Sequence, residues 1–237
     1  MTSIRIPTGM NGPAGSANGG VAAGTIAGLL DGAVSVRLHA PPPLDVDLPV
    51  TTDQDGVVTA AGADGAPVLS ARAVPRPTIP LPDIDPATVG EGTPLTEHPA
   101  ATCVVCGPER ADGLRLFPAP VPDHPGVLGT WWTPPTWASE NGVLRNDLLW
   151  GVLDCPGALA LMHQTDEPMF AALGSVTGEV LAPVRADERV LVLGFVLGRD
   201  GRKQHAGTAV LGREGDLRAH TTQLCIALPP AWAGPQG

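Results

Sequence analysis

The chain has 237 residues, of which 43% are hydrophobic, and a formal net charge of -10 with Lys203 as its single lysine. A chain of this length can bury one large core or two cores of roughly 100 residues each. The acidic balance excludes nucleic acid as the main partner, because no basic stripe exists to neutralise phosphates. We find no apolar run of about 18 residues and no basic-then-apolar leader, so we expect a cytoplasmic protein that does not span or bind a membrane.

The first predicted element is a helix over residues 17–30, which follows a polar glycine turn. Ser16 or Asn18 is a natural N-cap, and the segment then stays almost wholly apolar until Asp31 stops it. Alanines and glycines occupy positions 22, 23, 24, 27 and 28, so the helix backbone can lie close against its cover. A curved antiparallel sheet is the expected cover for such a narrow helix.

The beginning of this helix is a predicted binding site. We expect the amides of Gly19 and Gly20 to point into an open space, with Val21 directly behind them. A helix N-terminus combines unpaired N–H groups with about half a unit of positive charge. That combination favours an anion or a developing oxyanion.

Four strand candidates follow this helix. Residues 33–39 alternate apolar and polar side chains, as a half-buried strand does. The other candidates cover residues 48–50, 57–61 and 68–74, and hairpin turns separate them. The first part of the chain is therefore predicted to be a helix followed by an antiparallel meander.

A proline-rich segment over residues 75–99 divides the chain. Because proline lacks an N–H donor and fixes φ, we interpret this segment as an extended connector. The predicted organisation is an N-terminal domain over residues 1–75, a linker over residues 76–102 and a C-terminal domain over residues 103–237.

The four cysteines include a CxxCG motif, Cys103 to Gly107, just after the connector. The motif is half of a zinc-binding pattern, but no second CxxC or HxxxH pair accompanies it. A redox pair of the thioredoxin type needs a strand-to-helix junction, whereas turn residues follow here. We therefore expect two buried thiols in a turn and no metal site.

The second half of the chain repeats the plan of the first. Strand candidates at residues 113–117 and 129–132 lead to a long apolar helix candidate over residues 147–162. Pro156 should kink this helix or mark a first helical turn. Four more strand candidates cover residues 172–181, 189–198, 207–211 and 219–228. We interpret the two halves as diverged copies.

Asp154 is the strongest candidate for a catalytic residue. A lone carboxylate in an apolar helix is costly unless it is paired or meets solvent in a pocket. Desolvation raises the pKa of such a group toward the range of a general base. The alternative is that Asp154 is an N-cap just before Pro156.

Three segments carry a resemblance to a known family. They are the helix start Ser16–Val21, the motif Cys103–Gly107 leading to Asp112–Leu116, and Gly201–Lys203 before residues 206–209. Together they resemble hotdog-fold thioesterase-like proteins, in which an antiparallel sheet wraps a central helix and two units pack side by side. The resemblance covers most of both halves and implies an α+β double hotdog.

The resemblance also implies a set of catalytic residues. Double-hotdog acyl-CoA thioesterases use an Asp with a Gln and a Ser or Thr to orient water. Asp154 matches the Asp, Gln223 is similar to the Gln, and Ser175 or Thr177 is the candidate hydroxyl, with Thr177 included in the predicted site. Asn18 occupies in the first half a place similar to that of Asp154 and is included as well.

The implied reaction is hydrolysis of an acyl thioester, with coenzyme A as part of the substrate and no separate cofactor. Asp154 would deprotonate water while the helix-start glycine amides receive the carbonyl oxygen, where one donor is worth about 3 kcal/mol. Gly157 is a further predicted substrate-binding residue. Arg202 and Lys203 would meet the phosphates of coenzyme A, or form only a solvated hairpin tip. The expected partner is a small-molecule acyl thioester, and a homo-oligomer stays open.

Two other functions stay open. A hotdog dehydratase acting on a 3-hydroxyacyl thioester would need a His near Asp154, and His163 lies two and a half helical turns beyond it. The other alternative is a non-catalytic protein that binds acyl thioesters, because a fold can persist without chemistry.

Overall fold

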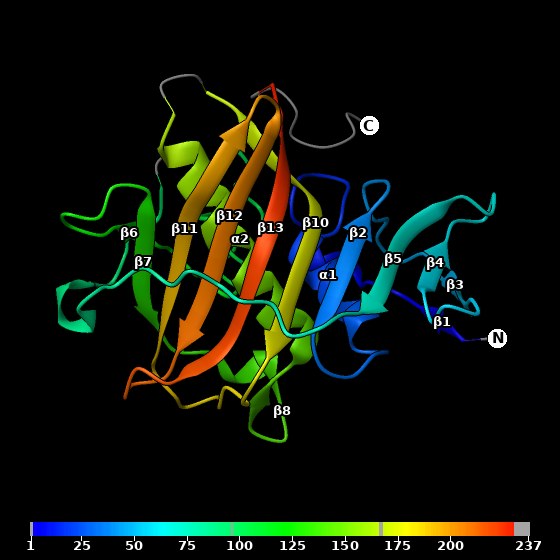
Figure 1. The fold of residues 1–237 in the computed structure, drawn as a ribbon, viewed down its shortest axis with the longest axis horizontal. Coiled ribbons are helices and arrows are strands. Elements are labelled where there is room, and N and C mark those ends of the chain that lie inside the picture. The colour runs from blue at the N-terminus through cyan, green and yellow to red at the C-terminus, as the bar shows by residue number, and fades with distance from the viewer. Residues whose placement is uncertain (1, 96, 166–167, 230–237) are drawn as a thin grey trace.

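The computed structural model describes residues 2–95, 97–165 and 168–229. In this part of the chain two α-helices, α1 (Gly19–Ala27) and α2 (Asn146–His163), lie behind one large antiparallel sheet in the view of Figure 1. The strands of the sheet, in spatial order, are β1 (Ser3–Ile4), β3 (Leu48–Thr52), β4 (Val58–Ala61), β5 (Pro67–Ala73), β2 (Val34–Leu38), β10 (Phe170–Val180), β13 (Leu217–Leu228), β12 (Lys203–Leu211), β11 (Val190–Asp200), β7 (Val127–Trp132) and β6 (Ala119–Pro120). A separate ladder pairs β8 (Ser139–Glu140) with β9 (Val143–Leu144), and short 3-10 turns occupy Thr8–Met10, Pro86–Thr88 and Thr136–Ala138.

The sheet contains the same arrangement of elements twice. In each half the strand after the helix, β2 or β10, lies at the centre of the sheet. The next three strands then return from the outside toward it, in the order β3-β4-β5-β2 in one half and β11-β12-β13-β10 in the other. β2 and β10 pair antiparallel, with Val36 opposite Val176, so one continuous sheet joins the halves. This repeated topology agrees with the duplication predicted from the sequence.

Side-chain alternation explains why these segments form strands. In β2, Val34 and Val36 are buried against the helices, whereas Arg37 between Val36 and Leu38 is exposed. The predicted strands of the first half correspond to β2 through β5, and those after the second helix correspond to β10 through β13. These strand predictions are confirmed in both halves, but the meander prediction is only partly correct, because β2 pairs with β5 and β10 with β13 instead of with the next strand in the chain.

The predicted strand over residues 113–117 is wrong. Leu114 and Leu116 are fully buried, which accounts for their apolar alternation. Their N–H groups donate to the carbonyls of Val104 and Val105, at 2.7 and 2.9 Å, but the segment does not join the sheet. Trp132 fixes it from β7, because its Nε1–H donates to the Leu114 carbonyl at 2.9 Å.

Two glycines of α1, Gly20 and Gly24, contact α2 rather than the sheet. A Cβ on Gly20 would lie 2.4 Å from the Trp150 carbonyl oxygen, and a Cβ on Gly24 would lie 2.6 Å from the Trp150 Cβ. Both distances are shorter than a van der Waals contact, so only glycine lets the two backbones approach this closely. The expectation that Gly24 faces the sheet is therefore wrong. The face of α1 that carries this glycine packs against α2.

α2 continues through Pro156. Proline provides no N–H to the preceding turn, and side chains of β13 donate to carbonyls there. Thr221 Oγ1 donates to the Leu153 carbonyl at 3.0 Å, and Gln223 Nε2 donates to the carbonyls of Leu153 and of Asp154, the latter at 3.2 Å. Asp154 thus lies in the interior of a continuous helix, and the N-cap alternative for it is excluded.

The proline-rich connector crosses the outer face of the sheet, in front of the strands in Figure 1. Arg76 near its beginning forms a bidentate ion pair with Glu179 of β10, with N···O distances of 2.6 and 3.0 Å. The Gly90 carbonyl further along accepts from the N–H of Trp131 in β7 at 3.3 Å. The connector therefore carries the chain from one half of the sheet to its far edge. The domain boundaries proposed from the sequence stay a prediction.

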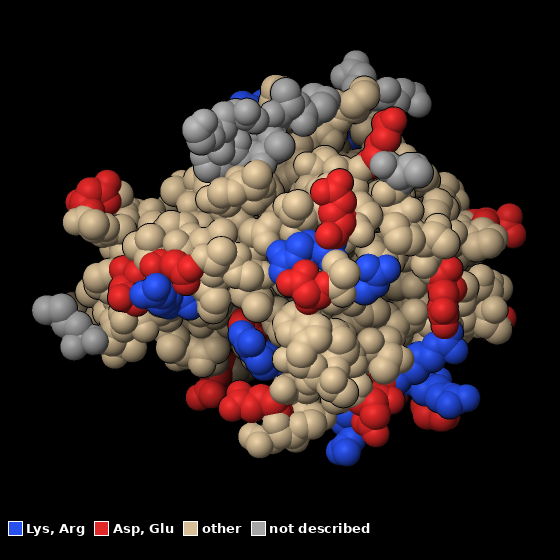
Figure 2. Space-filling model, turned by 180° about the vertical axis from the view of Figure 1, so that it is seen from behind, with Lys and Arg blue, Asp and Glu red and all other residues tan. Residues whose placement is uncertain are grey.

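Charged side chains of both signs are interspersed on the face seen in Figure 2. Lys and Arg lie beside Asp and Glu there, so the coloured part of this face carries no continuous basic surface. Neither helix of the described residues has the length and apolarity needed to cross a bilayer.

Candidate functional site

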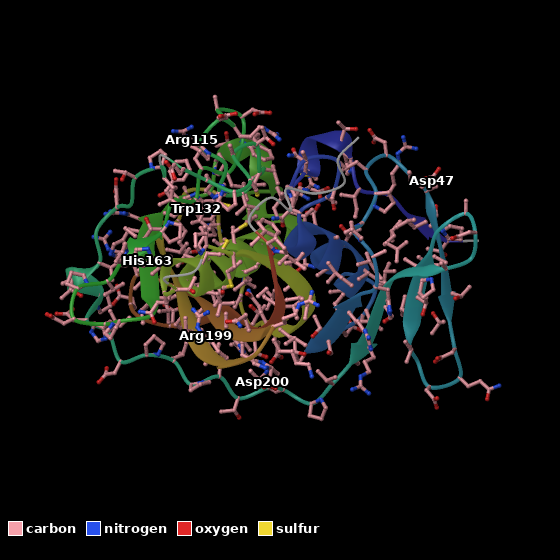
Figure 3. All side chains as sticks on the ribbon, turned by 90° about the horizontal axis from the view of Figure 1, so that it is seen from above. Asp47, Arg115, Trp132, His163, Arg199 and Asp200 are labelled. Carbon is pink, nitrogen blue, oxygen red and sulfur yellow. The ribbon has the colours of Figure 1, made fainter. Side chains whose placement is uncertain are left out.

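A cavity of about 290 Å³ lies where the two halves of the molecule meet. Its walls come from the turn before α1, the end of β2, the CxxC turn, the middle of α2 and adjoining ends of β10 and β13. Figure 3, seen from above, shows α1 and α2 meeting between the halves, with Asp47 far out in the first half and His163 and Arg115 in the second. The volume is at the lower end of the range typical of small-molecule sites, about 300 Å³ upward.

Asn18 begins α1 at the edge of this cavity. Its Oδ1 accepts from the N–H of Val21 at 2.9 Å, which confirms Asn18 as the N-cap, one of the two predicted residues. Its Nδ2 donates toward sulfur atoms, to Cys155 at 3.4 Å and to Cys103 at 3.6 Å. Val21 itself is fully buried in the core and does not line the cavity.

The two helix-start glycines have different partners. The N–H of Gly20 donates to Asp154 Oδ2 at 2.9 Å, so it does not point into open space as expected. Among the described residues no acceptor takes the N–H of Gly19, the first amide of α1. Gly19 lines the cavity, and a Cβ on it would lie 3.3 Å from Asp154 Oδ2. The structure thus brings Asn18, Gly19, Gly20 and Asp154 together.

Asp154 is a buried carboxyl group in the cavity wall, with only 7% of the residue exposed. Burial raises the pKa of Asp154 to about 7, the neighbouring Cys103 adds to the rise, and the Gly20 hydrogen bond opposes it. Desolvation is the dominant cause, as expected for a lone carboxylate in an apolar helix. A carboxyl group with this pKa exchanges protons near neutral pH, which a general base requires.

Three cysteines converge beside this carboxyl group. Cys103 and Cys106 from the CxxC turn and Cys155 from α2 place their sulfur atoms within 4.8 Å of one another, all buried. Hydrogen bonds from the other two thiols lower the pKa of Cys103 well below its usual range, whereas the hydrogen bond with Cys103 is the largest cause that raises the pKa values of Cys106 and Cys155. The sequence does not predict this cluster, because Cys155 is 49 residues after Cys106 in the chain.

Gln223 lies on the side of α2 that faces the sheet. Its amide contacts the backbone carbonyls of α2 and Thr208 Oγ1 at 3.3 Å, and it does not line the cavity. Gly157 makes room for it, since a Cβ there would lie 2.4 Å from Gln223 Oε1. The hydroxyls of Thr208 and Thr221, both fully buried beside Gln223, were not among the sequence candidates. Thr221 precedes Gln223 by two residues, the spacing of side chains on one face of a strand, whereas only the pairing of β12 with β13 brings Thr208 beside them.

Thr177 is not part of this group of residues. Its hydroxyl donates to Ser35 Oγ of β2 at 2.9 Å, while its neighbour Val176 is buried in the core beneath the sheet. Because successive side chains of a strand point to opposite faces, Thr177 lies on the outer face, away from Asp154.

The remaining predicted residues lie outside the cavity wall. Arg202 lies in the turn between β11 and β12, and Lys203 begins β12. Arg202 Nε donates to the carbonyl of Ala227, whose neighbours Ile226 and Leu228 do line the cavity. His163 is not a lining residue, but His98 is, and burial lowers the pKa of His98. His98 lies in the connector and was not among the residues predicted for the site.

No protein-family model and no curated protein sequence matches the chain. Solved structures do match. The tesB protein of Mycobacterium avium subsp. paratuberculosis aligns with 95% of this chain and 91% of its own, at 17% identity and a TM-score of 0.60. An acyl-CoA thioesterase II of Mycobacterium marinum aligns with 92% of this chain and 93% of its own, at 16% identity and a TM-score of 0.54. The chain therefore has the hotdog-like fold of the thioesterase II proteins.

Proposed function

We propose that the chain hydrolyses acyl thioesters in the central cavity, with Asp154 as the general base that activates water. One observation carries the proposal: the buried Asp154 carboxyl group lines the cavity and is held by the Gly20 N–H at 2.9 Å. A backbone donor on one carboxyl oxygen fixes the orientation of the group without supplying a competing side chain. General-base catalysis depends on such positioning before it depends on pKa.

The reaction follows from these positions. Asp154 accepts a proton from water as the water oxygen attacks the thioester carbonyl carbon. The tetrahedral intermediate then expels the thiolate, which takes up the proton from Asp154, so acid and thiol are the products. We assign the oxyanion to the Gly19 N–H, which has no acceptor among the described residues, instead of to both glycine amides. The Gly20 N–H instead holds the carboxyl group of the general base, Asp154.

We assign Gln223 a positioning role. It binds the carbonyls of Leu153 and Asp154 next to Pro156 and so fixes the turn of α2 that presents the base. The catalytic hydroxyl assigned to Thr177 finds no support, because that side chain points to the other face of the sheet. Asn18 acts in the proposal as the cap that orients the Gly19 and Gly20 amides.

The cavity lining suits an acyl chain. Apolar side chains of α2, β10 and β13, including Leu159, Met162, Leu173 and Ile226, line it beside the polar groups. We propose coenzyme A as the thiol carrier, with Arg202 and Lys203 of the nearby hairpin meeting its phosphates at the rim. The substrate is then an acyl-CoA.

In the same proposal the two halves are two hotdog units. Each unit contributes one helix and its strands, and the cavity forms where the helices meet. The boundaries at residues 75 and 102 would then separate the units by the connector that crosses the sheet.

The test is hydrolysis of a series of acyl-CoAs of increasing chain length, with free coenzyme A measured chromatographically because the protein carries its own thiols. Asp154→Asn should lower kcat/KM by about 10²–10⁴-fold and leave binding of a non-hydrolysable acyl-CoA analogue intact. Asp147→Asn, a change of the same kind in the first turn of α2, is the matched control, since Asp147 does not line the cavity. Absence of hydrolysis in the wild type, or equal rates in both variants, would refute the proposal.

One observation supports a dehydratase as the second candidate function. His98 lines the cavity that Asp154 lines, and its Nε2 is buried without a partner among the described residues. A dehydratase would produce a conjugated double bond from a 3-hydroxyacyl-CoA, which ultraviolet absorbance detects. Binding without either reaction would instead indicate a non-catalytic acyl-thioester-binding protein.

A further inference from the structure

Three thiols of this chain are arranged as a ligand set. Cys103 and Cys106 come from the turn after the connector and Cys155 from the middle of α2. The Sγ atoms of Cys103 and Cys155 lie 3.9 Å apart, and all three sulfurs lie within 4.8 Å of one another. None of the three is in a disulfide.

The spacing fits tetrahedral coordination. Zn²⁺ binds thiolate at about 2.3 Å, and two ligands of a regular tetrahedron of that size lie about 3.8 Å apart. The 3.9 Å between Cys103 and Cys155 matches this edge, whereas a disulfide would require about 2.05 Å. A CxxC turn is also a common way to supply two adjacent zinc ligands.

Hydrogen-bond donors surround the sulfur atoms and would stabilise them as thiolate ligands. The Val105 N–H donates to Cys103 Sγ at 3.4 Å, and Asn18 Nδ2 donates to Cys155 Sγ at 3.4 Å and to Cys103 Sγ at 3.6 Å. Groups that donate to coordinating atoms orient and tune them in metal sites. Gly107 keeps the turn tight, because a Cβ there would lie 2.4 Å from the Cys103 nitrogen.

We propose that Cys103, Cys106 and Cys155 bind one Zn²⁺ ion as three thiolates, with the fourth position turned toward the central cavity that all three residues line. The thiol protons leave to solvent on binding. The ion links the CxxC turn to α2, so two segments about 50 residues apart in sequence are held together as one wall of the cavity. This proposal goes beyond the proposed hydrolysis, and no step of that reaction passes through the ion.

The test measures metal content and cobalt spectra, not activity. The purified full chain should carry about one zinc per chain, and the metal-stripped protein titrated with Co²⁺ should show sulfur-to-cobalt charge-transfer absorption that saturates at one equivalent. Cys155→Ala should abolish this absorption. Cys225→Ala is the matched control, because Cys225 is buried in a different core cluster and lies outside the three-thiol group.

Wild-type protein without stoichiometric zinc and without the cobalt absorption would overturn the proposal, and this measurement does not depend on any variant folding. The same conclusion follows if Cys155→Ala, shown to be folded by circular dichroism, keeps the full absorption. Equal loss in Cys225→Ala and Cys155→Ala would also overturn it. A protein that binds zinc but hydrolyses no thioester would refute the proposed function and leave the metal site intact.

Discussion

The close approach of α1 to α2 at Gly24 makes a quantitative prediction. In Gly24→Ala the new Cβ would lie 2.6 Å from the Trp150 Cβ and 2.8 Å from the Asp147 Cα. Ordinary contact begins at 3.4 Å, so the helices must separate by about 3.4 − 2.6 = 0.8 Å. Such overpacking costs about 1–3 kcal/mol, against a gain of about 1 kcal/mol in helix propensity. The net expectation is a loss of up to about 2 kcal/mol.

Gly28→Ala is the matched control on the same helix. Its Cβ would meet nothing closer than 3.4 Å, and its φ of -63° suits alanine. This variant should be unchanged or more stable by up to about 1 kcal/mol. For a chain of this size each kcal/mol shifts Tm by roughly 2–4 °C. Thermal unfolding followed by circular dichroism should therefore place Gly24→Ala several degrees below Gly28→Ala. Equal or reversed Tm values would refute the helix contact.

Three further predictions concern stability. Gly157→Ala would place a Cβ 2.4 Å from Gln223 Oε1, so its urea midpoint should fall by an amount equivalent to about 1–3 kcal/mol; an unchanged midpoint would contradict the packing of Gln223 on α2. Trp132→Phe removes the donor to the buried Leu114 carbonyl and should cost about 1–3 kcal/mol in the same assay, whereas no loss would mean that this segment is held otherwise. Burial lowers the pKa of His220, so the unfolded chain binds this proton more readily. The contribution of neutral His220 to the free energy of unfolding should be fully present above about pH 6.5 and should be lost as the pH falls below that value. In His220→Gln the free energy of unfolding should fall less steeply between pH 7.5 and 5.5 than in the wild type. An identical slope in the two proteins would contradict the assignment of this pH dependence to His220.

The sheet was predictable because its strands follow local rules. Alternation in β2 indicates which face is buried, the apolar start of β11 indicates a strand that is buried on both faces, and tight turns give the ends. Residues 113–117 follow the same alternation yet form no strand. Their partners are Val104 and Val105 of a nearby loop, so burial alone, without a neighbouring strand, produced the pattern.

The candidate site was only partly predictable. Asp154 could be found because a carboxyl group in an apolar helix is costly, and it does line the cavity. The partner of Gly20 could not be read from the sequence, because it depends on the helix crossing. Thr177 was proposed because the resemblance implies a Ser or Thr, and a matching residue type does not determine the face of the sheet on which the side chain lies.

The thiol cluster shows the same limit. The CxxC spacing was visible, but a zinc site was set aside because no second pair follows in sequence. The third sulfur comes from Cys155 on a buried helix, where a lone cysteine is ordinarily a packing residue. Only the packing of the CxxC turn against α2 shows that the three belong together.

The central claim is that water activated by Asp154 attacks the thioester directly. A single turnover in H₂¹⁸O, with enzyme in excess over acyl-CoA, tests it by mass spectrometry of the released acid and of the protein. We predict one ¹⁸O atom in the acid from the first turnover and no label in the protein. Acid without ¹⁸O, together with ¹⁸O in the Asp154 carboxyl group, would show that this carboxylate attacks the carbonyl itself and would contradict the claim.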